Sequence, residues 1–183
     1  MSEELLIEHC SPTLAGIKTG NLFSCQYNSI NDVRNDIRYL NHILVPKGVR
    51  VVPMKFCNNR ALIYVFRPSK LYYDLTDIQA YRILTDMGYN CQNVSECVAM
   101  LAEKLHKCQD FPHEIGLFLG YPPEDVSGFI ENSGNNSKYT GCWKVYGDKN
   151  AAIKKFKSYK KCKDIYCNKW KNGTSIQRLT VVV

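Results

Sequence analysis

Two segments rich in β-branched and aromatic residues, 49–56 and 61–66, constrain the fold of this chain most. Four residues, Cys57 to Arg60, separate them, and the middle two are asparagines. Two β-rich runs joined this closely are typical of an antiparallel hairpin, because a parallel pair needs a crossover of roughly a dozen residues or more. The sequence therefore predicts a sheet that contains a 49–56/61–66 hairpin.

Helical patterns and short apolar runs occupy the rest of the chain. Capping residues and periodicity predict helices over about 30–45, from Thr76 to Gly88, after Ser95, over 124–131 and from Asp148 onward. Short strands are expected at 115–119, 139–146 and 176–183. We expect one α+β domain over residues 1–183, with a mixed or antiparallel sheet of about 4–6 strands packed by about five helices.

The length and the N-terminus bear on the compartment. A chain of 183 residues can bury a core without disulfides. It opens with MSEELLIE, which has neither the basic nor the apolar region of a signal peptide, and no apolar run reaches the roughly 18 residues of a membrane span. We therefore expect a cytoplasmic protein without a membrane segment, whose nine cysteines are mostly thiols. Without a Cys-x-x-Cys or His-Glu-x-x-His motif, the sequence predicts no metal site.

The first candidate site is a stretch after Cys10 in which small, hydroxyl and glycine residues surround Lys18. It is not a P-loop, because Ile17 separates Gly16 from the lysine, whereas a P-loop has lysine directly after glycine. We expect Lys18 to hold an anionic group, with Thr13 and Asn21 as further ligand-binding residues.

Cys10 itself is a candidate nucleophile. If Ser11 caps a short helix with Pro12 in its first turn, Cys10 lies just outside the helix N-terminus. Unpaired N–H groups there lower the pKa of a thiol and favour thiolate. The alternative is an inert, buried cysteine beside an ordinary capped turn.

The second candidate site begins at His113 and Glu114, which precede the strand expected at 115–119. A histidine titrates near neutrality and would act as a general base or a ligand, with Glu114 orienting it. Gly120 and Tyr121 follow in a turn that leads to the next helix. The alternative is that the His-Glu pair forms only local hydrogen bonds at the edge of a strand.

Trp143 and Lys144 form the third candidate site, on the strand expected at 139–146. A tryptophan beside a lysine would stack on a planar ligand. The alternative is a tryptophan that belongs to the core.

A lysine-rich helix carries the excess charge of the chain. The net charge is +7, yet residues 149–171 hold nine lysines and one acid, so the remainder is close to neutral. Either this is a solvated face or it binds an acidic protein. Nucleic acid is not expected, because the segment has no recognised motif and no arginine. The candidate partner-binding residues are Lys154, Lys157, Lys160 and Lys161.

Three motifs together resemble a domain-of-unknown-function family of about 180-residue proteins from anaerobic bacteria. They are HCSPTLAGIKTGNLF at 9–23, FPHEIGLFLGYPPEDV at 111–126 and WKVY at 143–146. The resemblance covers nearly the whole chain and brings no transferable activity. It implies a link to haem, iron or flavodoxin metabolism, with haem or flavin as cofactor and an acidic flavodoxin as partner of the lysine helix.

We therefore predict a small-ligand or cofactor pocket built from the 10–21 loop, the 113–121 segment and residues 143–144. Two alternatives stay open. One is a thiol-dependent enzyme with Cys10 as nucleophile, His113 as base and Glu114 as orienter. The other is an interaction module that binds an acidic protein on its lysine helix.

Overall fold

The computed structural model describes residues 2–90, 93–107 and 111–183. The chain is α+β, as the sequence predicts, and its elements group into two compact units. The first unit comprises Met1–Ser69 and Tyr159–Val183, and the second comprises Lys70–Ser158. Helix α8 (Lys149–Lys171) contributes residues to both units.

A three-stranded antiparallel sheet organises the first unit. Its strands β1 (Gly20–Gln26), β2 (Arg50–Cys57) and β3 (Arg60–Phe66) lie in the order β1-β3-β2. The predicted hairpin is confirmed: Cys57 pairs with Arg60 across a two-residue turn. Both turn residues, Asn58 and Asn59, have positive φ, which asparagine tolerates and which the tight hairpin turn requires.

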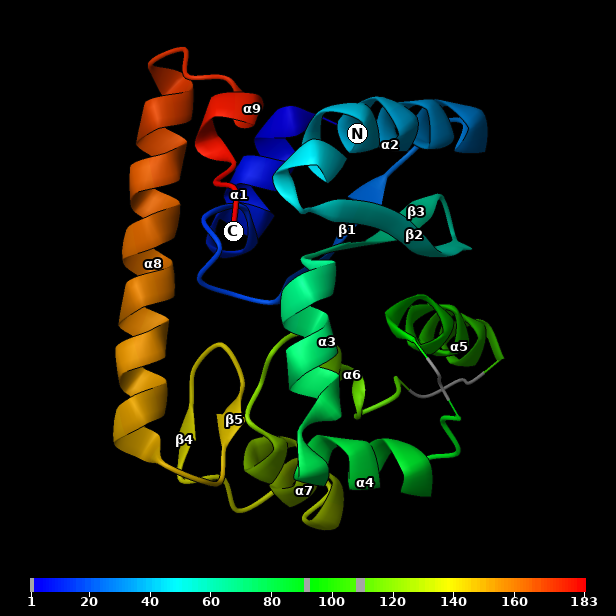
Figure 1. The fold of residues 1–183 in the computed structure, drawn as a ribbon, viewed down its shortest axis with the longest axis vertical. Helices are drawn as coiled ribbons and strands as arrows, with labels where there is room; N and C mark the ends of the chain where they lie inside the picture. The colour runs from blue at the N-terminus through cyan, green and yellow to red at the C-terminus, as the bar shows by residue number, and fades with distance from the viewer. Residues whose placement is uncertain (1, 91–92, 108–110) are drawn as a thin grey trace. The chain divides into compact units, whose positions relative to one another are not determined.

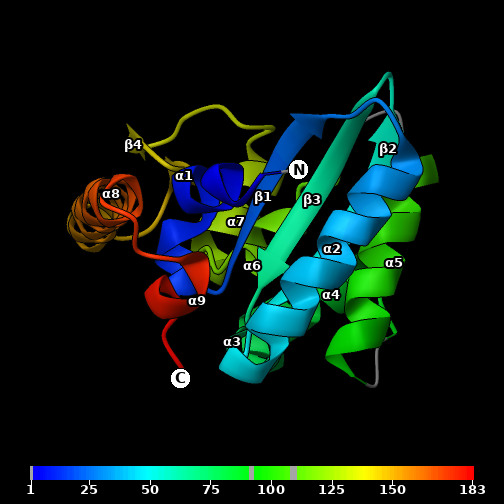
Figure 2. The ribbon, with the colours of Figure 1, turned by 90° about the horizontal axis from the view of Figure 1, so that it is seen from above.

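Helices cover one face of this sheet. Leucine, isoleucine and valine side chains of α1 (Glu3–Leu14), α2 (Ile30–Leu44) and α9 (Ile176–Leu179) share one core with Phe23, Ile63 and other residues of that face. Figure 1 shows these three helices on the same side of the strands. Seen from above in Figure 2, α2 and β3 run in nearly the same direction. A short 3₁₀ helix, η1 (Val45–Lys47), connects α2 to β2.

The second unit is mainly helical. Helix α3 (Pro68–Thr76) leads into α4 (Ile78–Asp86), α5 (Val94–Lys107), α6 (Ile115–Phe118) and α7 (Pro123–Glu131). A two-stranded sheet follows, in which β4 (Tyr139–Thr140) pairs antiparallel with β5 (Lys144–Val145). Helix α7 contacts α4, α6 and β5, so the small sheet packs on the helices. None of the helices in the described ranges has the length and apolar character needed to cross a membrane.

Two predicted strands are wrong. Residues 115–119 form α6 and a turn, because a short apolar run whose residues are all buried fits a helix as well as a strand. Residues 176–179 form α9, which starts where the Ser175 hydroxyl accepts a hydrogen bond from the Arg178 amide. The predicted strand at 139–146 is in fact the β4–β5 hairpin.

Other elements were not predicted. Strand β1 and helix α3 have no counterpart in the expected order, and the described strands divide into two sheets of three and two. Within the described ranges the structure has nine α-helices rather than about five. Strand β1 lies in a stretch whose sequence is typical of a loop, because it begins at Gly20 and carries few large apolar residues.

Candidate functional site

A cavity of about 300 Å³ lies within the second unit. Three segments form its walls: the turn into α6, helix α7, and the β4–β5 hairpin. Its lining is rich in aromatic rings and contains a single lysine and a single carboxylate among the described residues, which are Phe111, His113, Ile115, Gly116, Tyr121, Asp125, Val126, Phe129, Thr140, Gly141, Cys142, Trp143 and Lys144.

Trp143 is a fixed part of this wall. Its ring stacks on Tyr121 with centroids 4.6 Å apart and meets Phe156 edge-on at 4.5 Å. Its Nε1 donates a hydrogen bond of 2.6 Å to Asp125. Only 7% of the Trp143 surface is exposed, so this residue is buried, as the alternative interpretation expects. Tyr121, which stacks on it, also lines the cavity.

Asp125 holds the hairpin to α7. Besides Trp143, it accepts hydrogen bonds from the backbone amides of Tyr146 and Gly147, both at 2.7 Å. An acid in the first turn of a helix ordinarily does no more than complement the helix dipole. A buried carboxylate with three N–H donors instead fixes the position of the cavity wall.

His113, Phe129 and Lys144 form the other side of the cavity. The His113 ring meets Phe129 edge-on with centroids 4.9 Å apart, and Lys144 Nζ lies 5.8 Å from the centroid of the same ring. Lys144 Nζ also donates to the carbonyl of Gly134 at 2.6 Å. Both the imidazole and the ammonium group thus lie near the phenyl ring of Phe129.

Gly116 lines the cavity, and Gly120 ends the helix that carries it. A Cβ on Gly116 would lie 2.8 Å from Val126 Cγ2 and 3.0 Å from Tyr121 Cδ2, so a side chain there would force Val126 to shift and would crowd Tyr121. Gly120 ends α6 with φ of 74°, a conformation that favours glycine. Gly120 does not line this cavity; it lines a second cavity of about 430 Å³ in the same unit, which Tyr121 borders as well.

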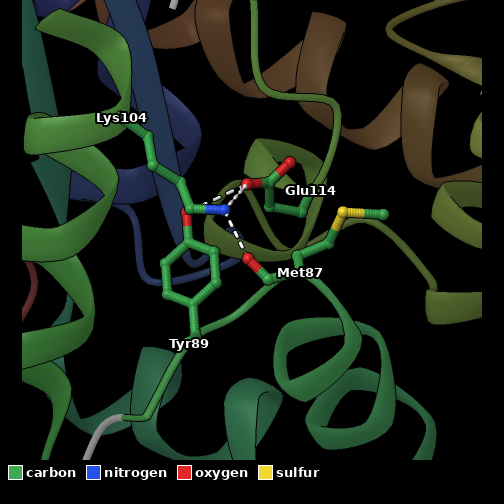
Figure 3. Close-up of polar contacts among 4 residues, drawn as sticks. All are labelled: Met87, Tyr89, Lys104 and Glu114. Atoms are coloured by element: carbon green, nitrogen blue, oxygen red, sulfur yellow. Dashed lines mark hydrogen bonds and ion pairs between the residues drawn. The ribbon is translucent and has the colours of Figure 1, made fainter. Parts of the chain in front are cut away.

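Glu114 faces a different environment from its neighbour His113. Figure 3 shows its carboxylate beside Lys104 of α5 and Tyr89. Lys104 Nζ lies 3.1 Å from Glu114 Oε1 and 2.6 Å from the carbonyl of Met87, and the Tyr89 hydroxyl donates to the same Oε1 at 3.2 Å. Within the described residues no hydrogen bond joins Glu114 to His113, so the predicted orienting role has no geometric support.

The predicted residues of the 10–21 segment lie in the first unit. Thr13 donates a 2.7 Å hydrogen bond to the side-chain oxygen of Asn21, which ties the end of α1 to the start of β1. Lys18 is 7% exposed, and its Nζ lies 6.0 Å from the ring centre of Tyr159. A pocket that joins these residues to His113 and Lys144 stays a prediction.

The helix-terminus argument for Cys10 is wrong. Helix α1 begins at Glu3, capped by Ser2, so Cys10 lies inside it and Pro12 falls in its last turn. Cys10 is fully buried, and burial raises the pKa of its thiol, the opposite of what a nucleophile needs. The geometry matches the alternative of a buried cysteine.

Sequence reasoning missed Arg67, which follows β3 and is 1% exposed. Its Nε donates to the carbonyl of Thr13 and its Nη2 to those of Leu14 and Val181, each at 2.7 Å, and Nη1 reaches the carbonyl of Lys47 at 3.2 Å. Helix α1 has no basic residue in its last turn, so this guanidinium supplies the positive charge that a helix C-terminus favours. An arginine directly after an apolar strand was the available signal.

The four lysines proposed to bind a partner, Lys154, Lys157, Lys160 and Lys161, are all exposed on α8. Asp148 caps this helix as predicted, accepting hydrogen bonds from the amides of Asn150 and Ala151. An acidic protein partner, flavodoxin included, stays a prediction.

The cysteines and the possible metal ligands do not point to a further site among the described residues. Cys97 is disulfide-bonded, whereas Cys10, Cys25 and Cys57 carry thiols; Cys91 and Cys108 lie outside the described residues. Among the residues that the structure describes, no three His, Cys, Asp or Glu side chains gather where they could hold a metal ion.

A family model described as "Protein of unknown function (DUF3793)" matches residues 6–180 of the chain. Comparison with curated proteins and with solved structures found no match. The family match covers both units, including every residue that lines the cavity.

Proposed function

The chain belongs to the DUF3793 family of proteins of unknown function, and we propose that its second unit binds a small aromatic molecule in the cavity between α6, α7 and the β4–β5 hairpin. The observation that carries the proposal is a hollow lined on several sides by aromatic rings. Small-molecule sites are typically concave and mostly apolar, with a few placed polar groups, and range from roughly 300 to 1,000 Å³. The cavity of about 300 Å³ lies at the lower end of that range.

The walls support an aromatic ligand in particular. Tyr121 and Phe129 line the cavity with their rings, and both are only half-buried, so each retains surface for a further contact. Stacked or edge-to-face aromatic pairs contribute about 1 kcal/mol beyond the area they bury. Because Asp125 and Phe156 fix Trp143 behind Tyr121, the wall is preorganised for a planar partner.

Haem and flavin belong to this ligand class, since both carry planar ring systems. Protein purified without oxygen would show the visible absorption of either one if it is the physiological ligand. A colourless protein that also fails to take up added haem or flavin mononucleotide would remove both and leave smaller ring systems as candidates.

The test of aromatic binding is a fluorescence titration with phenylnaphthylamine, a neutral two-ring probe whose emission rises in apolar surroundings. Phe129→Leu keeps the apolar bulk but removes one ring, and should weaken binding about fivefold. The matched control is Tyr139→Leu, which removes a ring of strand β4 that does not line the cavity and should leave binding unchanged. If wild type does not bind the probe, or both variants weaken binding equally, the proposal fails.

A further inference from the structure

Lys144 is half-buried and has no carboxylate partner among the described residues. Its Nζ donates one hydrogen bond, to the carbonyl of Gly134, and lies beside the ring of Phe129. An ammonium group has three N–H donors. Within the described part of the chain, no carboxylate forms an ion pair with Lys144, so it can donate to a bound molecule.

The one acidic residue among the described cavity-lining residues does not neutralise this lysine. Asp125 uses Oδ1 to accept from the amides of Tyr146 and Gly147, and Oδ2 to accept from Trp143. The charge of Asp125 is thus stabilised by N–H donors of the β4–β5 hairpin and of the two residues that follow β5. Among the described lining residues, no carboxylate therefore remains to pair with the ammonium group of Lys144.

His113, a second polar residue of the cavity, can also donate hydrogen bonds to a ligand. His113 contacts the Phe129 ring that Lys144 also approaches, and its side chain is exposed along the cavity. An imidazole donates an N–H in either neutral tautomer and two when charged. A ligand whose ring lies against Phe129 would therefore meet N–H donors from both residues.

We infer that the aromatic ligand of this cavity is an anion, a planar carboxylate, sulfonate or phosphate compound whose charged group binds to Lys144, with His113 as a second donor. This inference rests on the proposed function and narrows it to one charge class. It concerns only residues of the second unit.

The experiment compares two probes with the same rings: anilinonaphthalene sulfonate, which is an anion, and its neutral analogue phenylnaphthylamine. Wild type should bind the sulfonate about tenfold more tightly than the neutral probe, as a hydrogen bond to a charged group allows. Lys144→Met should remove that difference while changing neutral-probe affinity less than about twofold. Lys144→Arg, which keeps the charge, should retain most of it.

Lys138→Met is the matched control. Lys138 lies next to β4, and its Nζ also donates to a backbone carbonyl, that of Gly147 at 3.1 Å, but it does not line the cavity. This variant loses the same charge and a similar hydrogen bond, and should bind both probes as wild type does. If Lys144→Met keeps the preference for the sulfonate, or Lys138→Met loses it equally, the inference is overturned.

The two proposals fail in different ways. A wild-type protein that binds neither probe contradicts aromatic binding itself. A wild-type protein that binds both equally, with neutral-probe affinity that depends on Phe129, contradicts only the anionic ligand.

Salt gives a readout that needs no variant: the preference for the sulfonate should shrink as ionic strength rises, and a salt-independent preference would overturn the inference.

Discussion

The Lys18 segment of the first unit and the Lys144 cavity of the second unit are similar in residue types but differ in structure. Both place a lysine among glycine, hydroxyl and aromatic residues. In the first segment the polar groups are used by the chain: Thr13 binds Asn21, and the nearby carbonyls bind the buried Arg67. In the cavity, rings surround a hollow, and the lysine has one carbonyl acceptor and no carboxylate among the described residues.

This difference teaches how such patterns are best interpreted. A glycine- and hydroxyl-rich stretch after a helix is what ending that helix requires, because the last carbonyls need donors and the chain must turn. Gly16 has a φ of 74°, and a Cβ there would lie 2.5 Å from Val183. A binding site is indicated instead where apolar walls enclose space and a polar group is not fully used.

The substitution with the largest expected effect is Arg67→Met, which should lower the stability of the protein. The substitution keeps the apolar stem but leaves four carbonyls without their donor, so we expect a loss of about 3 kcal/mol or more in the free energy of unfolding. Chemical denaturation measures it. Arg60→Met, at the exposed opposite end of β3, should cost less than about 0.5 kcal/mol. Similar losses of stability in both variants would show that the hydrogen bonds of the buried guanidinium do not hold the end of α1 in place.

A second, smaller effect on stability should distinguish Glu114 from its neighbour in sequence, His113. Glu114→Gln removes the carboxylate that Lys104 and Tyr89 share, and should cost about 2 kcal/mol, because a partly buried ammonium then loses its ion pair. His113→Ala should change stability little and weaken sulfonate-probe binding instead. Unfolding curves and probe titrations on both variants test this division, and a Glu114 variant that folds normally but fails to bind would contradict it.

Much of the fold was predictable because it rests on local patterns. The β-rich runs at 49–56 and 61–66 and the apolar face of Val33, Ile37 and Leu40 predict the hairpin and α2. Residues 115–118 and 176–179 were assigned to strands wrongly, since neither run is long enough to show a helical period. Strand β1 was missed because it begins at Gly20 and its exposed positions, Ser24 and Gln26, are polar.

The candidate site was predictable in its residue types and less so in its grouping. His113, Tyr121, Trp143 and Lys144 do line one cavity. Phe129, which touches two of the four, gave no local signal, because a phenylalanine within an amphipathic helix resembles any core residue. Asp125 and Arg67 act through contacts distant in sequence, which no spacing rule reveals.

Thiol reactivity gives a smaller contrast between the two regions. Burial raises the pKa of Cys10, so at pH 8 its thiolate fraction is below that of an ordinary thiol. Cys142 is exposed at the cavity. Iodoacetamide should label Cys142 at least about tenfold faster than Cys10, as measured by peptide mass spectrometry. Bound sulfonate probe should slow labelling of Cys142 and leave that of the exposed Cys57 unchanged. Faster labelling of Cys10 would revive its role as nucleophile.

Hydrogen–deuterium exchange with and without anilinonaphthalene sulfonate tests the central claim most directly, because it reports on both regions in one sample. The account predicts slower exchange in residues 113–129 and 139–146 when the probe is bound, and unchanged exchange in residues 10–21. Protection of residues 10–21 with none along α7 and the hairpin would contradict it and move the ligand site to the first unit.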